Sequence, residues 1–278
     1  MTREIMNDAN LRRRMPLFLF ALTTLLLLAP GYTYAQRGGR GGDSQAGPPP
    51  TAKAAAPIDI TGYWVSLVTD NWIFRVITPA KSDYRYLPIN PEGRRVADTW
   101  DPAKDEASGN QCKGYGPVGV MRMPGRLHVT WENDNTLRID TDTGTQTRMF
   151  YFGASQEPAQ PSLQGYSVAQ WQLPGGGRGG RGRGGQGATA PQTRPGSSLK
   201  VVTTHMTPGY LQKNGIPYGG NAVLTEYFMT IEDKGVRYLA VTTMLDDPQY
   251  LTQSFVRTSQ FKKLPDAAGW NPTPCSAR

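Results

Sequence analysis

The stretch that decides the fold is AVLTEYFMTIEDKGVRYLAVTTML, residues 222–245. Two runs rich in Val, Thr, Tyr and Leu, 222–231 and 236–245, flank the short segment Asp233-Lys234-Gly235. β-Branched and aromatic side chains favour strands, and Asp and Gly tolerate the positive φ of a tight turn. The stretch therefore predicts an antiparallel β-hairpin.

Strand-like runs of this kind recur at short spacing along the chain, bounded by Gly, Pro, Asn and Asp, whereas helical patterns are scarce. Turn residues at 132–135 and 142–144 indicate that neighbouring strands pair as hairpins. The sequence therefore predicts an all-β fold, built as a single antiparallel meander. The expected strands are Gly62–Val68, Trp72–Ile77, Val118–Met123, Leu127–Glu132, Thr136–Asp140, Thr145–Phe152, Gly165–Leu173, Leu199–Met206, Ala222–Ile231, Val236–Leu245 and Ser254–Lys262.

A row of strands has unpaired edges, which closure into a barrel or packing into a β-sandwich removes. The entry segment Asp59-Ile60-Thr61-Gly62-Tyr63-Trp64 favours the barrel. Its Gly-x-Trp resembles the first-strand signature of lipocalin-like barrels, in which the tryptophan plugs the closed end. That resemblance implies a late-strand basic residue over Trp64, for which Arg257 and Lys262 are the candidates. A β-sandwich with Trp64 in its core remains the alternative.

Residues 1–35 have the three parts of a secretory signal peptide: the basic cluster at 12–14, the apolar run from Leu17 to Ala29, and small residues before a cut after Ala35. The apolar run is shorter than the roughly 20 residues that a membrane-spanning helix needs. We therefore expect cleavage and a mature protein without a membrane span, located outside the cytoplasm, either periplasmic or secreted.

Cys112 and Cys275 are the two cysteines of the chain, and both lie in turn-rich segments. An oxidising compartment favours their pairing as a disulfide. The spacings typical of metal sites are absent, and the two histidines, His128 and His205, lie on separate expected strands. We expect no metal and no cofactor.

The formal charge of +8 lies outside the expected barrel. Segments 1–35, 36–57 and 174–198 contribute +2, +2 and +4, and the remaining residues are formally neutral. A neutral fold offers no basic face for phosphate, so we expect no nucleic-acid partner. Segment 36–57 is a Gly/Pro/Ala-rich linker and 174–198 a Gly/Arg-rich loop, both predicted to be disordered, which leaves a single barrel domain over 58–278.

Six longer motifs span most of the expected barrel, and as a set they resemble a family of uncharacterised secreted bacterial proteins. This resemblance implies export and β architecture and supplies no reaction. The motifs are Gly-Tyr-Trp-Val-Ser (62–66), Glu-Gly-Arg-Arg-Val-Ala-Asp-Thr-Trp-Asp-Pro (92–102), Gly-Thr-Gln-Thr-Arg (144–148), Gly-Tyr-Ser-Val-Ala-Gln-Trp (165–171), Asn-Ala-Val-Leu-Thr-Glu-Tyr-Phe (221–228) and Asp-Asp-Pro-Gln-Tyr-Leu-Thr (246–252).

Polar and aromatic side chains alternate along several expected strands, and alternation sends each set to one face of a sheet. In a barrel one face is the interior, where a ligand site can form. The long loop 206–218 is rich in aromatic residues, Gly and Pro, and such loops often line the mouth of a barrel. The predicted ligand-binding residues are Trp64, Trp131, Arg148, Trp171, His205, Tyr210, Glu226 and Tyr227.

Three functions remain open. The first is a non-enzymatic barrel that binds a small, partly apolar or aromatic ligand. The second is a structural or partner-binding protein of the cell envelope. The third is a hydrolase or isomerase that uses Glu226, His205 and Asp246, although no serine lies in a Gly-x-Ser-x-Gly nucleophile motif and no catalytic residue is predicted.

Overall fold

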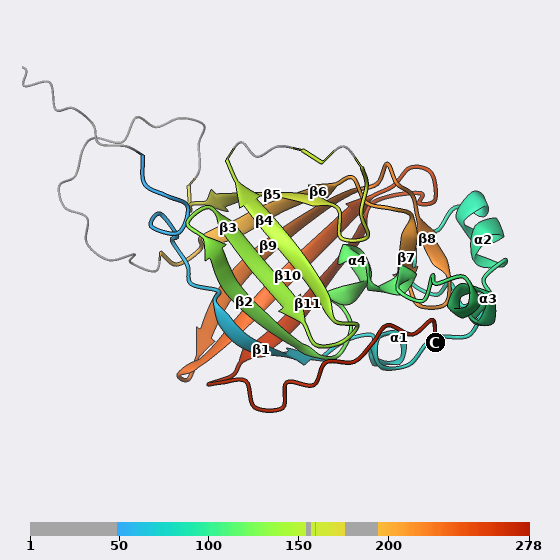
Figure 1. Ribbon diagram of the computed structural model, residues 1–278, viewed down its shortest axis with the longest axis horizontal. Coiled ribbons are helices and arrows are strands. Elements are labelled where there is room, and N and C mark those ends of the chain that lie inside the picture. The colour runs from blue at the N-terminus through green and yellow to red at the C-terminus, as the bar shows by residue number, and fades with distance from the viewer. Residues whose placement is uncertain (1–48, 154–156, 159, 176–193) are drawn as a thin grey trace, which may run out of the picture. The chain divides into compact units, whose positions relative to one another are not determined.

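A closed β-barrel forms the centre of the structure (Figure 1). The computed structural model describes residues 49–153, 157–158, 160–175 and 194–278. The predicted signal peptide 1–35, the linker up to residue 48 and the loop residues 176–193 lie outside the described residues. The predicted all-β barrel is confirmed, and the sandwich alternative is not observed.

Nine strands close the barrel in the order β1-β11-β10-β9-β6-β5-β4-β3-β2. The hairpin predicted from residues 222–245 is β9–β10, with Val236 opposite Asp233 across the turn. The bounds are β1 (Gly62–Leu67), β2 (Arg126–Asn133), β3 (Thr136–Thr141), β4 (Gln146–Phe152), β5 (Tyr166–Gln172), β6 (Ser198–Thr204), β9 (Val223–Asp233), β10 (Val236–Asp246) and β11 (Phe255–Lys263).

The predicted antiparallel meander holds for most neighbouring strands and fails at one place. β5 runs parallel to β4, with Phe150 opposite Ser167. A parallel pair needs a connection that returns the chain to the same end of the sheet, and residues 153–165 provide one where a tight turn would not. β6 pairs with β9 because the intervening residues form a separate two-stranded sheet, β7 (Gly209–Gln212) with β8 (Ile216–Tyr218).

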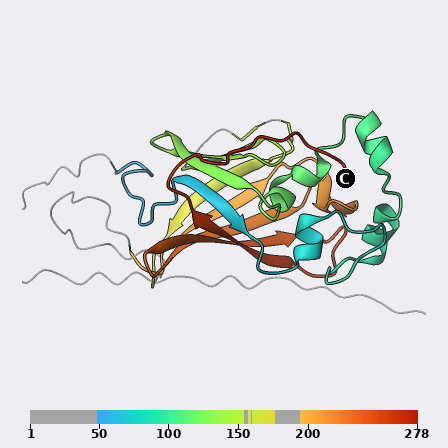
Figure 2. The same cartoon turned by 90° about the horizontal axis from the view of Figure 1, so that it is seen from below.

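Five short helices gather with the β7–β8 sheet at one end of the barrel, where the described chain also ends (Figures 1 and 2). Within the described part of the chain, no helix is long and apolar enough to cross a membrane. Asn90 and Asp101 cap two of the helices through their side chains. The helices are α1 (Trp72–Val76), α2 (Pro91–Ala97), α3 (Pro102–Ala107), η1 (Lys113–Tyr115) and α4 (Pro117–Val120).

Two of the expected strands are helices, so these predictions were wrong. Trp72–Ile77 contains α1, which begins after Asn71 in the left-handed conformation, with φ of 48°. Val118–Met123 overlaps α4, which begins at Pro117, a residue favoured at the first position of a helix. Apolar runs this short do not distinguish a strand from a buried turn of helix.

Trp64 lies on β1, which pairs with β11 on one side and β2 on the other, and its side chain is fully buried. Its indole Nε1 donates a hydrogen bond to the Ile60 carbonyl at 2.9 Å. The ammonium group of Lys263 lies 4.6 Å from the centre of its ring. A basic side chain therefore covers the tryptophan as expected, but it belongs to Lys263 and not to the predicted Arg257 or Lys262. The register of β1 against β11, which places Trp64 opposite Lys263, decides this.

The rest of the interior is filled by large side chains, among them Phe150, Phe228 and Phe261. One ion pair is buried among them. Arg148 of β4 donates to Glu226 of β9 through both Nη atoms, at 3.0 and 2.5 Å, and both side chains have zero exposure. Two of the predicted ligand-binding residues therefore lie in the interior of the barrel and pair with each other.

The predicted disulfide between Cys112 and Cys275 is present. Cys112 precedes η1 at the helical end of the barrel, and Cys275 belongs to the segment that follows β11. This segment also contacts the β3–β4 turn, where Thr273 N donates to Asp142 O at 2.9 Å. The bond therefore holds the end of the described chain against the helices.

Loss of the disulfide should lower stability by roughly 5 kcal/mol in the chain-entropy model, because the bond closes a loop across 163 residues. Urea unfolding of a Cys112→Ser, Cys275→Ser variant measures this. A reductant should destabilise the wild-type protein by the same amount and leave the variant unchanged. Equal stability of the variant and the oxidised wild type would contradict the prediction.

Arg148→Met should destabilise the barrel by about 3–5 kcal/mol, because it leaves the Glu226 carboxylate buried without a partner. Adding Glu226→Leu should restore much of that loss, since the double variant buries no charge. Urea unfolding of both variants and of Glu226→Leu alone completes a double-mutant cycle. A coupling below about 0.5 kcal/mol would show that the pair acts independently.

Candidate functional site

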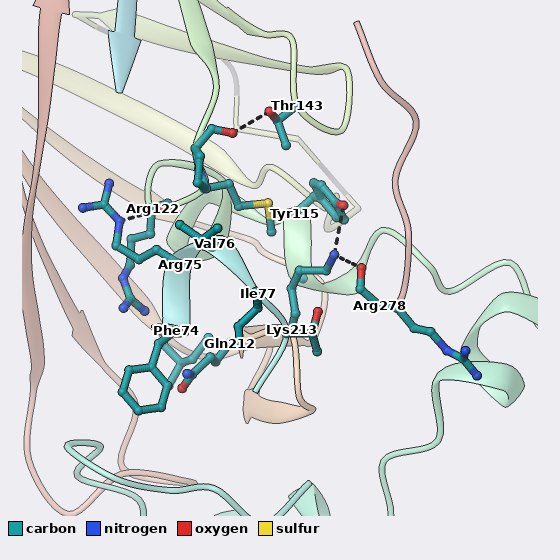
Figure 3. Close-up of a pocket in the computed structure, with 16 residues that line it drawn as sticks. Phe74, Arg75, Val76, Ile77, Tyr115, Arg122, Thr143, Gln212, Lys213 and Arg278 are labelled. Atoms are coloured by element: carbon teal, nitrogen blue, oxygen red, sulfur yellow. Dashed lines mark hydrogen bonds between the residues drawn. The ribbon is translucent and has the colours of Figure 1, made fainter. Parts of the chain in front are cut away.

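A cleft of about 550 Å³ lies at the helical end of the barrel (Figure 3). α1, α4 and β7 form its walls together with the segments that follow α1 and α4, and Arg278 lies at its edge. Its volume falls within the range of about 300–1,000 Å³ that is typical of sites for small molecules. We refer to it below as the end cleft.

The middle part of the end cleft is lined by apolar side chains. α1 and the residue after it contribute Phe74, Val76 and Ile77, and Met123 and Leu211 continue this surface. Arg75 holds α1 in place, since its Nε donates to the Arg122 carbonyl at 2.8 Å and its Nη1 contacts Asp70 at 3.1 Å. The apolar wall is therefore fixed by an arginine buried beneath it.

Cationic side chains line the same cleft, and the lining contains no aspartate or glutamate. In Figure 3 the guanidinium groups of Arg75 and Arg122 lie at one side of the cleft, and the Lys213 ammonium lies at the other. Lys213 Nζ donates to the Tyr115 hydroxyl at 3.4 Å and to the main-chain oxygen of Arg278. The cleft is therefore basic at both sides and apolar between them.

Arg122 is the unusual member of this group. Only 7% of its surface is exposed, and its guanidinium makes no hydrogen bond or ion pair within the part of the chain that the structure describes. It lies over the ring of Phe255, 5.2 Å from the centre. The Nη2 atom of the neighbouring Arg75 is also buried without a hydrogen-bond partner among the described residues.

The surroundings of Arg122 disfavour its charge. Burial, with the nearby Arg257 and Arg75, lowers the pKa of its guanidinium to about 10, and Asp70 offsets only part of this. Arg122 still carries its proton at neutral pH. A buried cation without a counter-ion is costly, and an anion in the end cleft would relieve that cost.

The turn of the β7–β8 hairpin fixes the position of Lys213. Gly215 has φ of +83°, and a Cβ at this position would lie 2.2 Å from the Cβ of Trp100. Only glycine fits this backbone against this ring. Asn214 donates from its side chain to the carbonyls of Ala80 and Asp83, which connects the hairpin to the segment after α1.

The predicted site residues lie in several places and do not form one site. Trp64, Arg148 and Glu226 are inside the barrel. His205 has positive φ and lies after β6, where its Nδ1 contacts the Thr204 hydroxyl at 3.1 Å and Glu157 at 3.2 Å. Tyr227 lies on β9, opposite residues of β6 and β10, on the face away from the interior.

Trp131 and Trp171 pack with Phe152 at the opposite end of the barrel from the helices, with ring centres 5.2–6.5 Å apart. Trp171 Nε1 donates to the carbonyl of Ala52 at 2.9 Å. These two tryptophans line a second cleft of about 400 Å³ together with Lys53, residues 56–61 and Leu137. Trp131 and Trp171, both predicted as ligand-binding residues, therefore lie together, but away from the end cleft.

Tyr210 lies on β7 and faces α3. Its hydroxyl donates to Asp105 at 2.8 Å, and the Lys113 ammonium lies 5.7 Å from the centre of its ring. Burial and the carboxylate of Asp105 raise the pKa of Tyr210. Tyr210 therefore has a structural partner of its own and does not line the end cleft.

Sequence reasoning did not identify Arg75 and Arg122 as functional residues. Each is a single arginine within an apolar run, WIFRVI at 72–77 and VGVMRM at 118–123. A lone charge in a run that a fold must bury is costly unless something pairs with it. A single arginine within an apolar run was therefore the sequence signal that could have identified these two residues.

No protein-family model, curated protein or solved structure matches this chain, so the resemblance to a family of secreted bacterial proteins stays a prediction.

Proposed function

We propose that this protein is a non-enzymatic, extracytoplasmic barrel that binds a small, partly apolar organic anion in the end cleft. The single observation that carries the proposal is Arg122, of which only 7% is exposed and whose guanidinium makes no hydrogen bond or ion pair among the described residues. It borders a cleft whose lining contains no carboxylate side chain.

The chemistry of the cleft suits a molecule with two parts. A carboxylate, phosphate or sulfonate would pair with Arg122, because a guanidinium offers a fork of donors that matches such groups. The apolar part would lie against Phe74, Val76 and Ile77. Lys213 at the other side would accommodate a second polar group. The ligand is thus an amphiphile, which agrees with the partly apolar ligand expected from the sequence.

The extracytoplasmic location rests on the predicted signal peptide and on the disulfide. Disulfides persist in oxidising compartments and are rare in the cytosol. Cys112 and Cys275 are bonded to each other, which is what such a compartment favours.

A structural or partner-binding role in the envelope is the second candidate, favoured by the large side chains that fill the barrel interior. The hydrolase or isomerase hypothesis has less support. Glu226 pairs with Arg148, His205 with Glu157, and Asp246 with Ser254. Within the described part of the chain, no ion pair joins His205 to Glu226 or to Asp246.

Arg122→Met should weaken binding of 1-anilinonaphthalene-8-sulfonate, an amphiphilic sulfonate, by about 10–100-fold, because a hydrogen bond to a charged group contributes about 1.5–3 kcal/mol. Fluorescence titration and calorimetry measure the affinity and the stoichiometry. Arg237→Met is the matched control, since Arg237 is a partly exposed arginine on the barrel wall.

The same Arg122→Met variant should resist urea better than the wild-type protein, because it removes a buried charge that has no partner. Unchanged sulfonate affinity in Arg122→Met, or an equal loss in Arg237→Met, would overturn the proposed site.

A further inference from the structure

The helix α1 buries a charged side chain and exposes apolar ones, which is the reverse of an ordinary surface helix of a globular protein. Its buried member is Arg75, while Trp72, Ile73 and Val76 are exposed by 61%, 36% and 57%. Ile77, directly after the helix, is exposed by 56%. A surface helix ordinarily buries its apolar face and exposes its charges.

A further aromatic side chain extends this apolar surface. Tyr86 is 73% exposed, and its ring packs edge-on against Phe74 with centres 6.1 Å apart. We call the exposed side chains of Trp72, Ile73, Val76, Ile77 and Tyr86 the α1 patch. Contiguous apolar surface of this kind marks a contact with a partner or a membrane.

The α1 patch is continuous with the end cleft, because Val76 and Ile77 belong to both. An apolar chain lying on the patch can therefore enter the cleft without crossing polar surface. This arrangement differs from the exposed apolar residues on the barrel wall, such as Ile231 and Val168, which do not line either cleft.

The charges around the patch favour an anionic surface. The acidic residues nearest in sequence already have partners, since Asp70 pairs with Arg75 and Asp83 with Arg85. Lys81 is exposed, and the carboxylate of Asp98 near it offsets its charge. The end cleft adds Arg122 and Lys213, and its lining contains no acidic side chain, so the charge beside the patch is positive on balance.

Trp and Tyr beside aliphatic side chains, with cations nearby, are typical of segments that lie in the interface of a membrane. A protein partner would match the apolar residues equally well, but it would not explain an anion site that opens directly beside them. These observations together select a membrane as the occupant.

We propose that the α1 patch docks into the interface of a membrane that contains anionic lipid, and that the end cleft takes up an anionic amphiphile from that membrane. Uptake rests on the proposed function, whereas docking stands without it. The ligand class is then a single-chain or small lipid-like anion.

The docking step is tested by flotation with vesicles of phosphatidylcholine alone and of equal parts phosphatidylcholine and phosphatidylglycerol. The wild-type protein should float with the mixed vesicles and less with the neutral ones. A Val76→Ser, Ile77→Ser variant should lose about tenfold or more in partitioning, because two aliphatic side chains no longer enter the interface.

The matched control is Val168→Ser, Ile231→Ser, because Ile231 is exposed by 54% and Val168 by 41%, close to the values at the α1 patch. This control should float like the wild-type protein. All variants contain residues 1–35, so any effect of that segment on flotation is the same in each. The test therefore rests on the differences in flotation between variants.

Three outcomes would overturn docking. They are no flotation of the wild-type protein, equal losses in the two double variants, or a self-association in sedimentation that the Val76→Ser, Ile77→Ser variant abolishes without any vesicle binding. Equal flotation with neutral and mixed vesicles would overturn the requirement for anionic lipid.

Arg122→Met separates docking from uptake. This variant should float like the wild-type protein but extract less of a pyrene-labelled fatty acid from the vesicles. Flotation with undiminished extraction would overturn the proposed function of the end cleft and leave docking in place.

Discussion

The antiparallel pairing of β1 with β11 is the constraint on which the rest of the structure depends. It closes the nine-stranded sheet, so that the barrel itself has no edge strand. Closure also fixes which side chains point inward, because the two faces alternate along each strand. Trp64 enters the interior through this pairing, and Lys263 is placed over its ring by the same register. The interior formed in this way must be filled, and it takes polar side chains only where they pair, as Arg148 does with Glu226.

A barrel filled in this way has little room for a ligand along its axis, and the two largest clefts described above lie outside its interior. The helices and the β7–β8 sheet collect at one end because the chain between β1 and β2 and between β6 and β9 is not needed for closure. Their backbone is held by side chains such as Arg75 and Asn214. These elements also have a buried hydrophobic cluster of their own, which includes Val118, Leu211 and Ile216.

The barrel could be predicted from the sequence, whereas the end cleft could not. The turn at Asp233-Lys234-Gly235 and the Gly-x-Trp at 62–64 are local patterns, and local patterns specify hairpins and the direction of side chains. The position over Trp64 was missed by one residue, because Lys262 and Lys263 point to opposite faces and only the register decides between them. The end cleft was missed because Arg75 and Arg122 come from segments far apart in the sequence. Their meeting depends on tertiary packing that no short window contains.

The end cleft is also the place where this sequence departs most from the rules that make a stable fold. A buried Arg122 without a partner among the described residues and an α1 with its apolar side exposed are both unfavourable for an isolated protein. Native sequences tend to be locally consistent, and departures concentrate where another molecule binds. The two departures differ in kind, one electrostatic and one hydrophobic, and both border the end cleft, whose lining contains Arg122, Val76 and Ile77. An amphiphilic anion satisfies both at once, which an inorganic ion or an uncharged apolar molecule does not.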